Sequence, residues 1–545
     1  MRPMTAREAW LSAGLVFVAA LAVRVVFASS LAFPTPEDTA YYVGVARNVI
    51  EGRGLVSDAI WSFQTPPLVF PRPAFEVWLP LPSVLTLPAM ALLGPTFDAA
   101  KISAVLVGSL VPVLAWRLAA DVAEERDFPV GRARTLAIGT GLTAAVFLPL
   151  VLFGALPDST MPFAALALTG TLLMTRLLRA PPSGSLLRDG RLLGLGLVLG
   201  LAALTRNEAA LIALTWAGLA WWQGARGLRR GLVLVPAAVA VLVFAPWAIR
   251  DWIAFGNPLP GQALANALSV TGFDIFAFRD PPTLARYLAI GPARLFELRI
   301  EGMWHNLANV LLAPGFPVSL IGLAALPWTG RARSLRPLVM FAIVSFLVTS
   351  LLFPVATTWG TFLHAAGAIH VLLIVSALLA LDALVERAGA WRGWTRPVAW
   401  LGPTLTIASA MLFSVALTGY ADQSAQVARR YELLAERMAA IGRPLDATSG
   451  PVVTDFPIWL AEALRIRTLA LPDESPAAVM ELAAAFSGTR YLVMADDDHG
   501  RWPEVLASAV PGADCFHALD LGPPPSDPAD ARSLAKTLVF EIGCP

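Results

Sequence analysis

The sequence has little charge and few lysines or cysteines. Asp, Glu, Lys and Arg make up 14% of the 545 residues, whereas a soluble domain carries about 25%. A chain with so little polar surface is not predicted to fold as a water-soluble globule. The net charge of +1 gives no electrostatic reason for binding nucleic acid, so nucleic acid is not predicted as a partner.

The sequence also lacks short motifs for zinc, redox or nucleotide-triphosphate chemistry. No CxxC, HExxH or P-loop pattern occurs. Gly196 and Gly200 lie inside an apolar run, where a GxxxG pattern indicates close helix packing. Cys515 and Cys544 both lie near the C-terminus, and we expect that they can form a disulfide if that region faces an oxidising compartment.

Long apolar runs are the dominant feature of the chain. Hydrophobic residues make up 57% of it, and the mean hydropathy is +0.65. A bilayer core of about 30 Å needs roughly 20 apolar residues per helix, and the runs predict about eleven transmembrane helices. The first run is interpreted as a retained anchor rather than a cleaved signal peptide, because it contains Arg24 and lacks a clear cleavage site. The predicted spans are residues 10–30, 100–121, 134–153, 161–177, 192–205, 208–222, 231–247, 303–328, 337–353, 363–384 and 398–417.

Arginines occupy alternate connections between these runs. The connections around Asp158 and Trp359 have no Lys or Arg, and because positive residues stay in the cytoplasm, the arginine-bearing connections are predicted to be cytoplasmic. This predicts a multi-pass protein of the plasma (inner) membrane with a cytoplasmic N-terminus. The outer loop 31–99, residues 250–302 and the tail would then be extracytoplasmic. The arginines that define the cytoplasmic set are Arg126, Arg132, Arg179, Arg188, Arg191, Arg226, Arg229, Arg230, Arg331, Arg333, Arg387, Arg392 and Arg396.

The same rule decides two ambiguous segments. Residues 75–94 are apolar, but three prolines interrupt them, and a crossing there would move every later arginine cluster outside. They are therefore predicted to form a re-entrant or interfacial helix on the outer face. Residues 192–222 are predicted to be a hairpin of two short spans, broken near Arg206 and Asn207.

The C-terminal region has a different pattern. Residues 451–454 and 491–494 are short β-type runs, and residues 476–486 have a helical pattern between them. Asp496 to His499 form an acidic run that we interpret as a surface loop. The predicted fold class is thus an all-α polytopic membrane bundle, residues 1–419, followed by a small extracytoplasmic α/β domain, residues 420–545.

The loop after the first span resembles a known enzyme class. Residues 37–55 read EDTAYYVGVARNVIEGRGL, residues 70–83 read FPRPAFEVWLPLPS, and residues 91–94 read ALLG. This set resembles the first outer loop of GT-C class membrane glycosyltransferases, especially family 39 (protein O-mannosyltransferase-like) and the bacterial lipid A aminoarabinose transferase group. The resemblance covers about the first half of the chain and includes Leu204-Thr205-Arg206. Arg72-Pro73-Ala74-Phe75 matches the family's K/H-P-P-L segment imperfectly, and the tail has no sugar-binding trefoil pattern.

The resemblance implies a polyprenyl-phosphate-linked sugar donor and an acidic catalytic base shortly before a Tyr. That position is Asp38 or, alternatively, Glu37. It also implies that Asp158 faces the active site. Glu76 is a third acidic candidate, because it follows Arg72 in the segment that we expect to pack near Asp38. The sequence alone also allows Asp38 and Asp158 to be helix N-caps. Carboxylates of this kind suit Mg²⁺ or Mn²⁺, and metal dependence is left open.

Arginine is suited to the phosphate of such a donor, because its planar fork matches phosphate oxygens. The candidates are Arg206, Arg72 and Arg250, and Arg206 is favoured because a break between short spans would hold it near membrane depth. The alternative is that these arginines only reach the lipid headgroups. His305 and His364 are interpreted as packing or hydrogen-bonding residues.

Together these features predict an inverting glycosyltransferase that transfers a hexosyl or pentosyl group. The acceptor would be a hydroxyl of a lipid, protein or polysaccharide at the extracytoplasmic face, and membrane lipids would surround the bundle. A transporter or lipid flippase is the alternative, although no internal repeat supports it. A membrane-anchored binding protein is a third reading, but it would not need so many spans.

Overall fold

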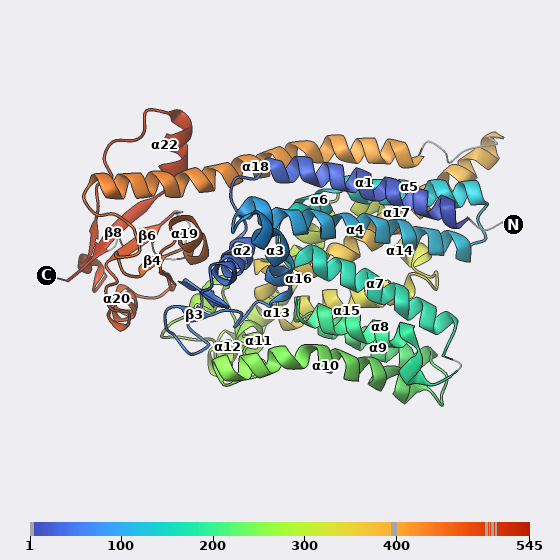
Figure 1. The fold of residues 1–545 in the computed structure, drawn as a ribbon, viewed down its shortest axis with the longest axis horizontal. Helices are drawn as coiled ribbons and strands as arrows, with labels where there is room; N and C mark the ends of the chain where they lie inside the picture. The colour runs from blue at the N-terminus through green and yellow to red at the C-terminus, as the bar shows by residue number, and fades with distance from the viewer. Residues whose placement is uncertain are drawn as a thin grey trace.

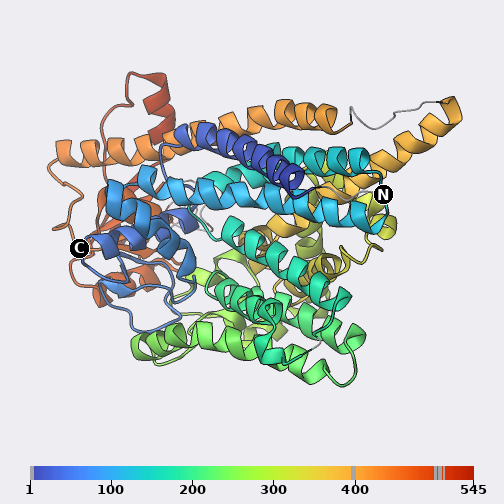
Figure 2. The ribbon, with the colours of Figure 1, turned by 45° about the vertical axis from the view of Figure 1, so that its right-hand side comes forward.

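The computed structural model describes residues 5–182, 184–393, 401–495 and 510–544, together with Gly500, Trp502 and Leu506. The acidic run from Asp496 to His499 lies outside the described residues. Long helices form a bundle, and a β-sheet lies beyond one end of it (Figure 1). We call this end the domain face and the opposite end, where the first helix begins, the N-terminal face. Turning the view keeps the sheet and the first loop together at the domain face (Figure 2).

The helices of the bundle are apolar and run between the two faces. Six of them are long and apolar enough to cross a membrane, or seven if the bent pair α5 and α6 is one span. The chain is therefore a multi-helix bundle, as predicted, although these six or seven do not establish the predicted number of about eleven. The helices are α1 (Ala6–Ser29), α4 (Phe97–Glu125), α5 (Val130–Val146), α6 (Leu148–Ala155), α7 (Thr160–Arg179), α8 (Gly190–Ala203), α9 (Ala209–Gln223), α10 (Arg229–Phe255), α14 (Val318–Thr329), α15 (Arg336–Leu352), α17 (Gly367–Arg392) and α18 (Leu401–Ala440).

The bend between α5 and α6 is stabilised by a buried arginine. The two helices meet at 58°, where Pro149 removes a backbone donor from the first turn of α6. Arg24 of α1 is fully buried, and its guanidinium donates to Ala145 O at 3.2 Å and to Leu150 O at 2.8 Å. These carbonyls flank the bend, so the arginine binds α1 to the kinked helix.

The hairpin predicted for residues 192–222 is confirmed. Helices α8 and α9 are separated by a break at residues 204–208. A Cβ added to Gly196 would lie 2.6 Å from Val239 Cβ, and one added to Gly200 would lie 2.6 Å from Val243 Cβ. Since real side chains do not approach so closely, the glycines allow α8 to pack directly on α10, and the helix-packing interpretation is confirmed.

The single span predicted at residues 303–328 is wrong. The helix begins earlier, as α13 (Gly291–Trp304), continues as the π-helical η3 (His305–Leu312), and stops before α14. Pro314, Gly315 and Pro317 lie in the interruption, where proline supplies no N–H to continue a helix. A π-helical segment is rare and is often found at functional sites.

The first loop lies on the domain face. It contains α2 (Glu37–Ile50), the short strands β1 (Val56–Ser57), β2 (Ala59–Ile60) and β3 (Arg72–Pro73), and α3 (Leu81–Leu93). With 13 residues, α3 is about 20 Å long, which is too short for a membrane crossing. Leu81 N donates to Leu204 O at 2.9 Å, so the start of α3 is joined to the break between α8 and α9. The shorter helices of this face are α11 (Ala263–Leu268), η2 (Gly272–Phe276), α12 (Leu284–Ala289), η4 (Ala356–Trp359) and α16 (Thr361–Ala365).

Five strands of the C-terminal region and β2 of the first loop form a six-stranded sheet, and helices connect the C-terminal strands, as the predicted α/β pattern requires. The strand order is β2-β5-β4-β6-β8-β7, with β2, β5, β4 and β6 parallel and β8 antiparallel to both of its neighbours. The elements after α18 are β4 (Val452–Thr454), α19 (Pro457–Leu464), β5 (Thr468–Ala470), α20 (Pro476–Ala485), β6 (Tyr491–Met494), β7 (Phe516–Ala518), α22 (Pro528–Leu534) and β8 (Leu538–Ile542).

Two connections join this sheet to the bundle. The edge strand β2 comes from the first loop and pairs with β5, with Ala59 opposite Thr468. Helix α18 is continuous over 40 residues, so the expected division between residues 419 and 420 falls inside it. Cys515 and Cys544 form a disulfide near the C-terminus.

Candidate active site

A cavity of about 780 Å³ lies at the domain face, where the bundle, the first loop and the C-terminal region meet. The start of α2, the break between α8 and α9, the π-helical η3 and the start of α16 each supply polar side chains. The polar and aromatic side chains that line the cavity include Glu37, Asp38, Tyr42, Trp61, Trp78, Arg206, Asn207, Glu208, His305, Asn309, Thr358, Trp359, His364, Phe456 and Trp459.

Two of the predicted carboxylates lie on either side of one histidine. His364 Nε2 is 3.3 Å from Asp38 Oδ2, and His364 Nδ1 is 3.6 Å from Asp158 Oδ2. The ring is also within 2.7 Å of Thr160 Oγ1 through Nδ1. The hydrogen-bonding interpretation of His364 is confirmed, and the ring also lines the cavity beside Asp38.

Asp158 supports this histidine from behind and is not among the lining residues. Thr160 N donates to Asp158 Oδ1 at 2.5 Å, which is the capping contact that the sequence allowed. The other oxygen, Oδ2, is buried and has no hydrogen-bond partner among the described residues. Half of this carboxylate therefore positions the backbone, and half faces the histidine.

Arg206 is the one arginine among the described residues that line the cavity, and no described lysine lines it. Its guanidinium forms two bonds of 3.0 Å with Glu208, from Nε and Nη2, and donates from Nη1 to Ser159 Oγ at 2.8 Å. The helix break provides this geometry, because Arg206 and Glu208 both lie in it. The adjacent negative charge of Glu208 favours the charged form of the partly buried arginine.

Burial and charge determine the protonation of these groups. Burial raises the pKa of Asp38, and this rise is opposed by the charge of Arg206 and by a hydrogen bond from Trp78. Burial raises the pKa of Asp158 to about 7. Burial and the charge of Arg206 lower the pKa of His364 well below its ordinary value, so this ring is neutral near pH 7.

Glu37 and Asp38 are adjacent in sequence but contact different parts of the molecule. Glu37 Oε1 accepts a hydrogen bond of 3.0 Å from Ile458 N, in the first turn of α19. Burial raises the pKa of Glu37 to about 8. Glu37 is thus attached to the C-terminal region, whereas Asp38 faces His364.

Besides Asp158, three other predicted residues do not line the cavity. Arg72 and Glu76 form an ion pair of 3.0 Å that is almost completely buried, and Arg72 also donates to Thr65 O. Arg250 donates to Ala74 O at 2.7 Å and pairs with Asp251 at 2.9 Å. These contacts tie the first loop to itself and to α10, which is a structural arrangement that sequence spacing did not reveal.

The sequence interpretation missed most of the wall of the cavity. His305 and Asn309 lie one turn apart on η3, with 3.3 Å between their nitrogens, and both line the cavity. Aromatic rings from the first loop and the C-terminal region complete the wall. The available signal was topological, because His305 and His364 lie at span ends on the same predicted side as Asp38.

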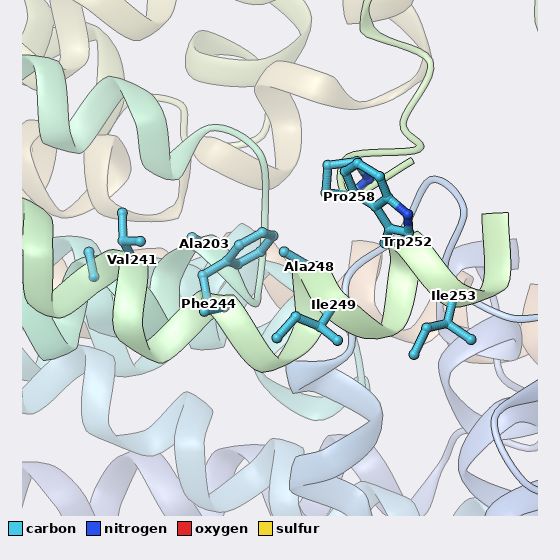
Figure 3. Close-up of a pocket in the computed structure, with 10 residues that line it drawn as sticks. Ala203, Val241, Phe244, Ala248, Ile249, Trp252, Ile253 and Pro258 are labelled. Carbon is cyan, nitrogen blue, oxygen red and sulfur yellow. The ribbon is translucent and has the colours of Figure 1, made fainter. Parts of the chain in front are cut away.

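A second pocket is apolar and lies on the side of the bundle. Its volume is about 530 Å³, and Figure 3 shows its lining side chains along α10 from Val241 to Ile253. Ala203, the last residue of α8, also lines it, so the pocket begins close in sequence to Arg206. Only 11% of the most apolar window of α10 is buried, so this face is open to the surroundings of the bundle.

No group of three or more His, Cys, Asp or Glu side chains that could hold a metal ion occurs within the described ranges. Asp38 and Asp158 lie on either side of His364.

Comparisons with known proteins identify the fold. No family model and no curated protein matches the sequence. ArnT from Cupriavidus metallidurans bound to undecaprenyl phosphate superposes with a TM-score of 0.56 and 16% identity over 97% of each chain. The oligosaccharyltransferase AglB from Archaeoglobus fulgidus, in complex with an inhibitory peptide and a dolichol-phosphate, superposes with a TM-score of 0.51. The sequence identity is 13%, and the match covers 93% of this chain and 72% of that one. Both are GT-C glycosyltransferases, so the chain has the GT-C fold of a multi-pass membrane protein, as the first loop indicated.

Proposed function

We propose that the protein is a membrane glycosyltransferase that moves a sugar from a polyprenyl-phosphate donor to an acceptor hydroxyl, with inversion at the anomeric carbon. The observation that carries this proposal is the meeting of Asp38, His364 and Arg206 in one cavity. A base and a cation in a partly closed site are the two groups that such a displacement needs. The bound undecaprenyl phosphate and dolichol-phosphate of the two similar structures support a lipid-linked donor.

Asp38 is the general base in this mechanism. The acceptor oxygen attacks the anomeric carbon while the bond from that carbon to the phosphate oxygen breaks, and the acceptor proton passes to the Asp38 carboxylate. The neutral His364 carries its proton on Nε2 and donates it in a hydrogen bond to Asp38, 3.3 Å away. With the proton on Nε2, Nδ1 accepts a hydrogen bond from the Thr160 hydroxyl 2.7 Å away, and this contact holds the ring in that orientation.

Arg206 stabilises the departing phosphate. Negative charge on the phosphate grows as the bond to the sugar breaks, and a fixed guanidinium in a low-dielectric site is effective at that point. Glu208 and Ser159 fix the plane of the guanidinium. Arg72 and Arg250 lie among backbone carbonyls and carboxylates, so the proposal gives them no contact with the donor.

The donor lipid lies in the apolar pocket on α10. The pocket is lined almost entirely by carbon atoms and includes Ala203, whereas Thr205 and Arg206 line the polar cavity. A polyprenyl chain in the pocket would therefore have its phosphate beside Arg206. Burying such a chain contributes about 0.8 kcal/mol per CH₂ group.

The domain face is extracytoplasmic in this proposal, and the membrane is the plasma membrane. The connections from α4 to α5, α7 to α8, α9 to α10 and α14 to α15 all lie at the N-terminal face, and they carry the arginine clusters (Figure 1). The Cys515–Cys544 disulfide agrees with an oxidising compartment on the other side. Alkaline phosphatase fused to the C-terminus should be active, and activity of a fused cytoplasmic reporter instead would reverse the orientation.

A divalent cation would have to be held by Asp38 together with the donor phosphate, because the His364 ring lies between Asp38 and Asp158. Carboxylate oxygens are ligands that Mg²⁺ and Mn²⁺ accept. A bound cation would add positive charge for the donor phosphate. Transfer measured in EDTA, with and without restored Mg²⁺ or Mn²⁺, tests this part by itself.

The direct test is to incubate membranes that contain the protein with radiolabelled polyprenyl-phosphate sugars. We expect label to be transferred to a lipid, protein or polysaccharide. We expect this transfer to be lost in membranes that contain the Asp38→Asn variant at equal abundance. Hexosyl and pentosyl donors should be compared. Movement of labelled donor across reconstituted vesicles without any transfer would instead support a transporter or flippase.

A further inference from the structure

The C-terminal region supplies part of the cavity wall. Phe456 and Trp459 lie at the start of α19, and both line the cavity. Their rings are stacked, with centroids 4.6 Å apart and planes 23° apart. Asp455 stabilises the turn before α19, because its carboxylate accepts hydrogen bonds from Phe456 N at 3.0 Å and from Ala495 N at 2.8 Å.

Glu37 attaches this aromatic pair to the residue next to the base. Its carboxyl accepts from Ile458 N, between the two rings in sequence, and hydrogen bonding to Trp459 N also acts on it. Pro457, the first residue of α19, has no N–H. The backbone N–H groups of Ile458 and Trp459 are therefore the first donors at the N-terminal end of this helix. Glu37 therefore joins the aromatic pair to the residue next to Asp38, and the buried Arg47–Glu462 ion pair joins the same two helices further along.

The first loop extends the aromatic wall. Trp61 and Trp78 line the cavity with centroids 4.7 Å apart, and Trp78 also forms a hydrogen bond with Asp38. Trp459 packs against the buried cluster that contains Trp78. The indole Nε1 of Trp459 has no hydrogen-bond partner among the described residues.

The cavity therefore has a cationic group at Arg206 and an aromatic pair at the start of α19, and Asp38 lines it as well. In a displacement with inversion, the acceptor oxygen and the leaving phosphate lie on opposite sides of the anomeric carbon. With the phosphate at Arg206, the acceptor occupies the aromatic side. Flat, weakly polar C–H faces of a sugar ring pack well on indole and phenyl rings, while ring hydroxyls can accept from an indole N–H.

We propose that Phe456 and Trp459 bind a sugar ring of a carbohydrate acceptor, and that Glu37 is a positioning residue for this platform. The inference rests on the proposed transferase function and assigns its acceptor class. A hydroxyl of a protein side chain would bring no ring to cover these aromatic faces. The C-terminal region is thus an acceptor-binding element of the catalytic cavity.

The first experiment measures transfer kinetics of the full-length protein with the donor identified by the labelling assay. Phe456→Ala and Trp459→Ala should each raise the acceptor KM about tenfold, from the lost ring contact, while the donor KM stays constant. Release of free sugar to water should persist, because Asp38 and Arg206 are intact. Trp221→Ala, an exposed tryptophan of α9, is the matched control. An unchanged acceptor KM, or an equal rise in the donor KM, would overturn the proposal.

The second experiment separates positioning by Glu37 from catalysis. Glu37→Gln keeps an oxygen that can accept from Ile458 N, so its acceptor KM should stay near that of the unaltered protein. Glu37→Ala removes this oxygen and should raise the acceptor KM with little change in free-sugar release. Complete loss of transfer in Glu37→Gln would make Glu37 a base and contradict the assignment.

A binding measurement distinguishes failure of this inference from failure of the proposed function. Purified protein is titrated with undecaprenyl phosphate in a thermal-shift assay, and separately with methyl hexosides and methyl pentosides in saturation-transfer NMR. Ring-proton saturation that is lost in Trp459→Ala and kept in Trp459→Phe supports the platform. Undecaprenyl phosphate binding with no glycoside saturation, or with saturation of a Ser/Thr peptide instead, overturns it. Failure of undecaprenyl phosphate to bind counts against the donor proposal alone.

Discussion

The two faces of the bundle use charged residues in opposite ways. At the N-terminal face, Arg132 donates to Asp382 at 3.0 Å and to Glu386 at 2.8 Å, while Glu125 accepts from Arg179 and from the backbone of Ser334. At the domain face, Asp158 Oδ2 has no described partner, and Asp38 lies 3.3 Å from a neutral histidine. Paired charges join helices at the N-terminal face, whereas Asp38 lines the cavity, forms no ion pair with an arginine or lysine among the described residues, and is available to a substrate.

Asp38→Asn is the largest expected disruption of this contrast. An amide cannot take the acceptor proton, so transfer should fall about 1000-fold while abundance and membrane insertion are unchanged. The neighbouring Glu37→Gln should keep at least about a tenth of transfer, because the buried Glu37 already has its pKa raised to about 8 and is mostly neutral at pH 7. Equal rates for Asp38→Asn and the unaltered protein would remove Asp38 from the mechanism.

Arg206→Ala should have the second largest effect. Loss of the guanidinium removes charge stabilisation of the departing phosphate and should lower kcat about 100-fold. Arg206→Lys keeps the charge without the planar fork and should recover part of the rate. Single-turnover rates with a fixed donor measure both variants. A normal rate in Arg206→Ala would assign the phosphate to another group.

His364→Phe tests whether the ring between the two carboxylates orients Asp38. Phe has a similar ring and no N–H donor, so we expect about a tenfold fall in kcat with donor KM nearly constant. Thr160→Val, which removes one contact of the same ring, should give a smaller fall. Unaltered kcat in both variants would return His364 to a packing role.

The pH profile follows from the burial of Asp38. A base works when ionised, and burial raises the pKa of Asp38, so transfer should decline on acidification at a higher pH than an exposed aspartate would give. Loss of the histidine N–H in His364→Phe removes a stabilising bond to the ionised form and should move this decline to still higher pH. Transfer rates between pH 5 and pH 9 measure both. A shift toward lower pH would contradict the assigned hydrogen bond.

Arg132→Met at the N-terminal face should have the smallest effect on catalysis. The substitution leaves the buried Asp382 without its arginine, so the thermal inactivation temperature should fall. Transfer per folded molecule should stay within about twofold, because Arg132 is at the opposite end from the cavity. A large fall in kcat with unchanged stability would show that the two faces are coupled.

Much of the fold was predictable because it depends on local patterns. Apolar run length gave the helices, and arginine placement gave the hairpin broken near Arg206 and the short helix after residue 80. The span predicted at residues 303–328 was wrong because its prolines and glycine break a run that hydropathy alone joins. Arg72 and Glu76 were both predicted to belong to the site, yet the two side chains neutralise each other inside the first loop.

Sequence by itself determined a helical membrane bundle, an α/β tail, and the same predicted side for Asp38, Asp158 and Arg206. It could do so because hydropathy, proline and charge act on neighbouring residues. Only the tertiary structure placed His364 between the two aspartates, joined Glu37 to α19 and added β2 to the sheet. Those contacts join residues hundreds of positions apart, and their geometry depends on how whole helices pack against one another.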